Sequence, residues 1–181
     1  MRFLSSLIVF LCCSVALGLG LVVFLNASTQ VDAAPSLKPH QARADAIVIE
    51  KAARSLTLLR NGKEISRYRV RLGFSPSGAK TEEGDGKTPV GEYRIDRRND
   101  RSRFHLSLGI NYPLPAQRAA AQQRGVSPGG DIFIHGQPNR IRGLGLSIPF
   151  DWTDGCIAVS NREIEEIFSL VAIGTKVTIL P

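Results

Sequence analysis

One cysteine and one histidine in the second half of the chain have the types and setting for nucleophilic catalysis. Cys156 lies in the segment Trp152–Asn161, and His135 follows residues 131–134, which predict a short buried strand. A nearby imidazole can accept a thiol proton, and backbone N–H groups can stabilise the oxyanion that forms when sulfur attacks a carbonyl. Gly155 permits a sharp turn, so the N–H groups of Gly155 and Cys156 are the expected oxyanion donors. The pattern predicts nucleophilic catalysis by a cysteine with a histidine base.

Cysteine usage supports a reactive role for Cys156. Cys12 and Cys13 fall in the apolar N-terminal run, so Cys156 is the only thiol in the rest of the sequence. An unpaired thiol in an oxidising compartment is a liability unless it is buried, paired with another chain or reactive. A zinc site is not expected, because Cys156 and His135 lack further ligands at a metal-binding spacing. No cofactor is predicted.

The first 33 residues predict export, either as a cleaved signal peptide or as a retained anchor helix. No charged residue occurs between Phe3 and Gln30. The apolar run 3–25 is longer than the roughly 7–15 residues of a cleaved signal core and is long enough to cross a bilayer. Val31-Asp32-Ala33 offers small residues for cleavage, but the length of the run favours the anchor. Either way, residues 34–181 are expected to face the cell envelope or periplasm.

The formal net charge of +7 belongs to the predicted exported part, because Arg2 and Asp32 cancel within the export segment. The arginines concentrate at five positions: Arg94, Arg97, Arg98, Arg101 and Arg103. Such a run can bind nucleic acid, but no stacking aromatics interleave with it at a readable spacing, and export removes the protein from nucleic acid. We interpret it as a solvated surface and predict no nucleic-acid partner.

The chain beyond a polar linker at 34–45 predicts one mostly β domain over residues 46–181. The runs 47–49 and 56–59 are rich in β-formers, and Asn61-Gly62 is a favoured hairpin turn before a returning strand. Gly84–Gly91 contains too much Gly and Pro for regular structure and is expected to form a surface loop.

Two short helices are expected in this domain. Ser160 and Glu163 have the spacing of a capping box, and apolar residues follow at helical intervals until Gly174. Residues 176–180 then read as a final strand. The Ala- and Gln-rich segment Ala116–Arg124 predicts a short exposed helix.

The order of these segments resembles the L,D-transpeptidase (YkuD-like) catalytic domain family. Its signature is His-Gly, a spacer and then Ser/Thr-x-Gly-Cys-Ile-x-x-x-Asn, which matches residues 135–136 and 153–161. Lys87–Tyr93 is similar to the loop and strand that precede the family's site, and Gly174–Ile179 to its closing strand. The resemblance covers about residues 46–180 and implies a β-sandwich-like fold that presents a cysteine nucleophile.

The resemblance also implies roles and partners. Cys156 corresponds to the nucleophile and His135 to the base, with Gly136 and Thr153 expected to orient the histidine. In the family the thiolate attacks the L-to-D bond of a peptidoglycan tetrapeptide stem and expels D-alanine, and an amine then resolves the thioester. The implied partners are stem peptides, or an envelope protein as the acyl acceptor, and a monomer is expected. Carbapenems are implied to acylate the cysteine.

Two positions depart from the family pattern. Asp154 stands where the family usually has His, and Ala158 stands where it usually has an Arg that is expected to meet a substrate carboxylate. The candidate replacements for this arginine are Arg140, Arg142 and Arg162. The negative charge of Asp154 by itself would raise the pKa of the neighbouring thiol, which an imidazolium at the base would have to offset.

Other readings remain open at this point. Trp152 fits either core packing or a substrate-facing wall, and Asn161 is a further candidate substrate contact. Water in place of the amine would make the protein an L,D-carboxypeptidase or an amidase. A peptidoglycan-binding module without turnover is the alternative of a different class.

Overall fold

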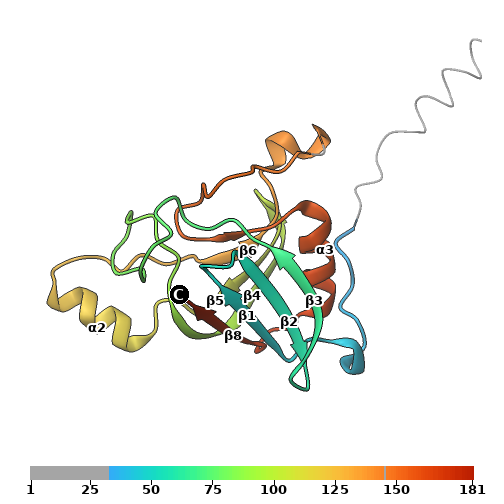
Figure 1. Cartoon of the computed structure of the whole chain (residues 1–181), viewed down its shortest axis with the longest axis horizontal. Helices are drawn as coiled ribbons and strands as arrows, with labels where there is room; N and C mark the ends of the chain where they lie inside the picture. Colours follow the sequence, from blue (N-terminus) through green and yellow to red (C-terminus); the bar gives the residue numbers. More distant parts are fainter. Residues whose placement is uncertain (1–32, 145) are drawn as a thin grey trace, which may run out of the picture. The chain divides into compact units, whose positions relative to one another are not determined.

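The computed structural model describes residues 33–181 apart from residue 145 (Figure 1). The predicted export segment lies outside the described residues except for Ala33, and the whole apolar run 3–25 lies outside them. Among those that are described, no helix is long and apolar enough to cross a membrane. Residues 34–181 form one compact unit, and the account below concerns that unit alone.

An eight-stranded sheet forms the body of this unit, in the order β3-β2-β1-β8-β4-β5-β6-β7. β1 is parallel to β8 and β6 is parallel to β7, whereas the other neighbours are antiparallel. The strands are β1 (Ala46–Glu50), β2 (Ser55–Arg60), β3 (Lys63–Arg69), β4 (Gly91–Ser102), β5 (His105–Ile110), β6 (Phe133–His135), β7 (Ile157–Ala158) and β8 (Lys176–Leu180). The expectation of a mostly β fold is confirmed.

The sheet curves so that the two ends of the strand order meet. β4 pairs with β8 through its first residues and with β5 through the rest, and its pairing with β5 shifts between Ile95 and Arg97. Such irregularities bend a strand and increase its twist. At the far end, Arg71 and Ala158 exchange backbone hydrogen bonds of 2.8 Å in both directions. The chain after β3 therefore returns to β7, and the curved sheet encloses one apolar core.

Local sequence signals explain several elements. Asn61 and Gly62 both have positive φ, as a tight two-residue hairpin turn requires, and they join β2 to β3. The α3 helix (Asn161–Leu170) starts at the predicted capping box: the Ser160 hydroxyl accepts from Glu163 N at 3.3 Å, and the Glu163 carboxylate accepts from Ser160 N at 2.7 Å. The apolar stripe of α3 packs against β5 and β6.

The remaining elements are short. The α2 helix (Pro115–Gln123) buries only Ala121 and lies apart from the sheet (Figure 1). Two 3-10 helices, η1 (His40–Ala42) and η2 (Asn139–Leu144), flank the body. Part of the predicted linker packs on the domain, because Ala44 is buried and its N–H donates to Leu170 O at 2.9 Å.

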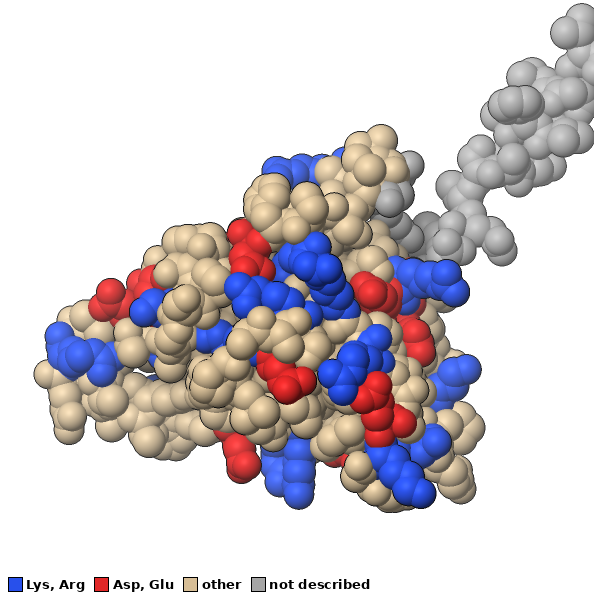
Figure 2. Space-filling view, in the orientation of Figure 1, with Lys and Arg blue, Asp and Glu red and all other residues tan. Residues whose placement is uncertain are grey.

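Lysine and arginine side chains are spread over the face shown in Figure 2, with acidic side chains between them rather than in one separate patch.

Candidate active site

The pairing of β6 with β7 brings Cys156 and His135 to the same groove. Ile134 is paired with Ile157 and His135 with Ala158, and both isoleucines are fully buried in the core. Because side chains alternate along a strand, His135 projects away from this core side, and Cys156 directly precedes Ile157. Both side chains line a groove of about 750 Å³ that is also bounded by the β4–β5 hairpin and by residues 152–154.

The His135 ring is held in one orientation. Its Nδ1 lies 2.7 Å from Gly136 O, and because a carbonyl only accepts, Nδ1 carries the proton and Nε2 is left as the basic nitrogen. The ring packs against Phe104, with centroids 4.5 Å apart, and edge-on to Trp152 at 5.7 Å. Trp152 thus lines the groove and supports the imidazole at the same time.

Asn161 lies behind this histidine. Its Oδ1 accepts from Gln137 N at 2.8 Å, and a Cβ added to Gly136 would come within 2.6 Å of that oxygen. The Gly136 N–H donates to Phe104 O at 3.0 Å. Asn161 therefore fixes the backbone next to His135, and it is not among the described residues that line the groove.

The Cys156 side chain lines the groove, and its thiol is hydrogen-bonded to the backbone of residues 131 and 133. Sγ accepts from Phe133 N at 3.4 Å and donates to Asp131 O at 3.5 Å. Burial raises the pKa of Cys156 to about 11, and the carboxylates of Asp154 and Asp131 add to this, whereas the Phe133 N–H and the Lys80 charge oppose it. Asp154 thus acts in the direction expected from the sequence.

His135 is not the imidazolium that would offset the effect of Asp154 on the thiol pKa. Burial lowers the pKa of His135 to about 4, against a smaller opposing effect of the Gly136 carbonyl. The resting pair at neutral pH is therefore a neutral thiol and a neutral imidazole. This pairing suits general-base catalysis, in which His135 takes the proton as sulfur attacks, rather than a preformed thiolate–imidazolium pair.

The turn before Cys156 depends on Thr153 and Gly155. Gly155 has φ +122°, and a Cβ there would lie 2.6 Å from Lys87 O. Thr153 Oγ1 donates to Cys156 O at 2.7 Å and accepts from Gly155 N at 3.2 Å. Thr153 thus shapes the turn before Cys156, and its hydroxyl forms no hydrogen bond to His135 in the described structure. Because the Gly155 N–H is engaged by Thr153, the Cys156 N–H is the more direct of the two expected oxyanion donors.

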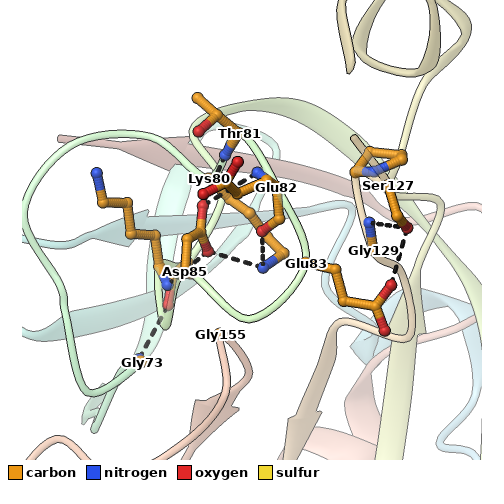
Figure 3. Close-up of polar contacts among 12 residues, drawn as sticks. Gly73, Lys80, Thr81, Glu82, Glu83, Asp85, Ser127, Gly129 and Gly155 are labelled. Carbon is orange, nitrogen blue, oxygen red and sulfur yellow. Dashed lines mark hydrogen bonds and ion pairs between the residues drawn. The ribbon is translucent and has the colours of Figure 1, made fainter. Parts of the chain in front are cut away.

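A loop pinned by a buried ion pair packs on this turn (Figure 3). Lys80 Nζ lies 2.8 Å from Asp85 Oδ1, and their side chains are only 3% and 7% exposed. The same carboxylate accepts from Thr81 N at 2.8 Å and from Lys87 N at 3.0 Å. Burial alone would raise the pKa of Asp85, but the hydrogen bonds from Lys80 and the backbone outweigh it and lower the pKa to about 2. The loop so held places Lys87 O against Gly155.

A second buried lysine secures the same loop. Lys51, at the end of β1, is 3% exposed, and its Nζ donates to Thr88 O at 2.9 Å and to Gly78 O. Burial lowers the pKa of Lys51, and the charges of Lys87 and Arg54 lower it further. Sequence reasoning predicted the Gly-rich loop but missed these lysines and Asp85. Asp85-Gly86 ahead of Lys87 is a turn signal that could have pointed to Asp85.

Two of the three arginines proposed as substrate contacts do not line the groove in the described part of the structure. Arg140 is an exposed residue of η2 and is not among the described groove-lining residues, and Arg162 is exposed on α3. The side chain of Arg142 lies outside the described part of the structure. The arginines that do line the groove are Arg101 and Arg103, on the β4–β5 hairpin.

The model of the L,D-transpeptidase (YkuD) catalytic domain matches residues 44–179. The chain belongs to this family. The match includes both His135 and Cys156 together with the loop that packs on Gly155. No protein matches in the comparison with curated proteins.

Several solved structures share the fold. A variant of the helical cell shape determining protein Pgp2 from Campylobacter jejuni is 25% identical, with a TM-score of 0.59 over 82% of this chain and 51% of that chain. Bd1075 from Bdellovibrio bacteriovorus gives a TM-score of 0.55 at 22% identity over the same shares. An L,D-transpeptidase from Xylanimonas cellulosilytica gives 0.50 at 18% identity, over 78% of this chain and 62% of that chain. The chain thus spans about half the length of the first two proteins.

Proposed function

We propose that this protein is a peptidoglycan L,D-transpeptidase that acts in the cell envelope after export. The observation that supports this most is that His135 in β6 and Cys156 directly before the paired strand β7 face one groove, with the imidazole held by Gly136. Membership of the family supports the same chemistry. Its substrates are tetrapeptide stems, and its acceptor is an amine of a second stem or of an envelope protein.

The first half of the reaction forms a thioester. The thiol rotates from Asp131 O towards the groove, and His135 Nε2 takes its proton as Sγ attacks the carbonyl of the L-to-D bond. The Cys156 N–H stabilises the oxyanion, joined by the Gly155 N–H once it is released from Thr153. Collapse of this intermediate breaks the C–N bond, and His135 returns the proton to the departing D-alanine nitrogen.

The second half reverses these roles. The acceptor amine enters beside His135 and attacks the thioester carbonyl, while the histidine takes its proton. The new C–N bond forms as the C–S bond breaks, and the proton passes to the Cys156 sulfur. Water at the same position would give hydrolysis instead, so the identity of the product distinguishes a transferase from a carboxypeptidase.

The similarity to a cell-shape protein supports a role in remodelling the cell wall. This chain matches only about half of that protein. The role proposed here is therefore limited to the reaction on stem peptides. The uncharged run 3–25 supports export and anchoring in the inner membrane.

The test is intact-protein mass spectrometry together with product analysis. Purified protein is incubated with a disaccharide-tetrapeptide or with a carbapenem, and we expect one acyl adduct per chain and cross-linked dimers from the tetrapeptide. Cys156→Ala should give neither, and His135→Ala should be nearly as damaging because base and nucleophile act as a unit. His40→Gln, in exposed η1, is the matched control and should behave as wild type.

Three outcomes would contradict the proposal in different ways. Normal processing by Cys156→Ala would exclude the cysteine mechanism. Tripeptide as the sole product would identify an L,D-carboxypeptidase. Folded protein that forms no adduct with either compound would favour a binding module.

A further inference from the structure

The arginine cluster of β4, which the sequence suggested to be a solvated surface, divides into two groups. Arg94 donates to Gly174 O at 3.0 Å, and Arg98 stacks on the Phe168 ring at 3.7 Å while donating to the Phe168 carbonyl. Arg97 pairs with Asp131 at 2.9 Å and with Asp96 at 3.2 Å. These three guanidinium groups have structural partners.

Arg101 and Arg103 form the second group. Both are exposed and line the active-site groove, and no acidic side chain among the described residues forms an ion pair with either of them. The backbone that carries them is nevertheless fixed. Asn139 Nδ2 donates to Ser102 O at 2.9 Å, and Asn139 N donates to Arg103 O at 3.0 Å. Two unpaired cations are thus held at the wall of the groove.

These arginines lie on the His135 side of the site. Phe104, the neighbour of Arg103, stacks on the imidazole at 4.5 Å, and its carbonyl accepts from Gly136 N. Asp131 lies on the other side, where its carbonyl contacts the Cys156 thiol. The remaining acidic lining residues are Glu83 and Asp154. The groove therefore has two arginines without acidic partners beyond the base, whereas the acidic lining residues lie elsewhere in it and one of them, Asp131, is paired with Arg97.

We propose that Arg101 and Arg103 form a carboxylate subsite that binds the departing D-alanine and then the acceptor amino acid. This inference rests on the proposed function. His135 must reach the nitrogen of the leaving group to protonate it, so that group lies on the histidine side of Cys156. A free carboxylate separated from that nitrogen by a single carbon would then point towards the hairpin arginines. Guanidinium groups suit this role because they bind carboxylates in a planar, two-pronged geometry.

The same geometry selects the acceptor. The attacking amine must occupy the position that the D-alanine nitrogen has left, because His135 takes its proton there. An amine with an α-carboxylate places its charge on the same two arginines, whereas a simple alkylamine or water does not. The subsite therefore favours acceptors with an amino acid centre, and it supplies a carboxylate contact that Ala158 cannot provide.

The experiment compares two synthetic disaccharide-tetrapeptides that differ only in the last residue, D-alanine with a free carboxylate or D-alaninamide. Rates of release are measured for wild type, for Arg101→Gln/Arg103→Gln and for Arg140→Gln, an exposed arginine outside the groove lining. The two leaving groups differ equally for every enzyme, so the change in the acid-to-amide ratio of kcat/KM isolates the carboxylate contact. Reaction of Cys156 with iodoacetamide checks that each variant keeps its site.

We expect the double variant to lose about a hundredfold in kcat/KM for the acid, because two charge-assisted hydrogen bonds are removed, and its acid-to-amide ratio to fall by a similar factor relative to wild type. Arg140→Gln should keep the wild-type ratio. A ratio unchanged in the double variant, or an equal loss in Arg140→Gln, would overturn the subsite.

A binding measurement keeps this test separate from that of the proposed function. Calorimetry with Cys156→Ala protein, which cannot turn over, should show tighter binding of the acid than of the amide, and the preference should vanish when both arginines are replaced. If wild type processes neither peptide, the proposed function fails, and this measurement still decides the subsite. Equal binding of the acid and the amide to Cys156→Ala protein would refute the carboxylate subsite.

Discussion

Charged side chains have opposite roles behind the cysteine wall of the active-site groove and on its histidine wall. On the cysteine side, Lys80 and Asp85 are buried, paired and bonded to backbone. On the histidine side, Arg101 and Arg103 are exposed and have no acidic partner among the described residues. Charges that are buried and satisfied hold a backbone in place, whereas unpaired charges on a fixed hairpin remain available to a ligand. The difference separates a wall that shapes the nucleophile from a wall that binds substrate.

The largest effect on stability is expected from Asp85→Ala. Removing the carboxylate leaves the Lys80 ammonium buried without its partner, which costs about 3–5 kcal/mol of unfolding free energy. Denaturant unfolding measures this. The control is Glu64→Ala, which removes the exposed partner of Arg67 at 2.7 Å and should leave the midpoint nearly unchanged. Similar midpoints for both variants would show that the Lys80–Asp85 pair does not hold the loop.

A smaller effect is expected from the titration of His135, which lies between the two walls. Its pKa is about 4 in the folded protein and about 6.5 when unfolded, so the unfolded chain binds more protons between these values. Stability should fall by about 3 kcal/mol as the pH drops from 6.5 to 4. His135→Gln should lack this part of the pH dependence. Parallel stability curves for the two proteins across this range would contradict the burial of a neutral imidazole.

The close packing beneath the cysteine wall predicts a third effect. A Cβ on Gly73 would lie 2.0 Å from Gly86 O and 3.1 Å from Gly155 Cα. Gly73→Ala must therefore displace backbone, at a cost of about 1–3 kcal/mol, and should lower kcat because the nucleophile turn moves. In Gly130→Ala the added methyl meets only Pro113 Cδ at 3.9 Å, so this control should be neutral or slightly more stable. Thermal unfolding of the two variants tests this contrast in stability, and turnover of Gly73→Ala is compared with that of wild type.

The features that the sequence revealed were local ones. The runs of β-forming residues, the Asn61-Gly62 turn and the Ser160 capping box each depend on neighbouring residues, and the structure contains the strands, hairpin and helix that they predict. Cys156 and His135 could be singled out because the surrounding residues repeat a family signature. Their meeting in one groove follows from the parallel pairing of two very short strands.

The features that the sequence did not reveal depend on contacts between distant segments. Asp85, the partner of Lys80, is near in sequence, but the burial of this ion pair follows from the packing of the loop on Gly155 and on Gly129. Arg101 and Arg103 could not be separated from Arg94, Arg97 and Arg98 by composition. Their separate roles follow from the bend and the irregular pairing of β4. Arg98 contacts α3 and Arg97 contacts Asp131, whereas Arg101 and Arg103 line the groove.

The smallest effect on stability is expected on the substrate wall. Arg101→Gln/Arg103→Gln removes two exposed charges that make no ion pair within the described residues, so the free energy of unfolding should change by less than about 0.5 kcal/mol. Asp85→Ala should lose stability and activity together, whereas the arginine variant should lose activity alone, and chiefly towards the free carboxylate. Denaturant unfolding and the acid-to-amide ratio, measured on the same preparations, make the comparison. A large loss of stability in the arginine variant would mean that both walls are structural, and the division between them would then fail.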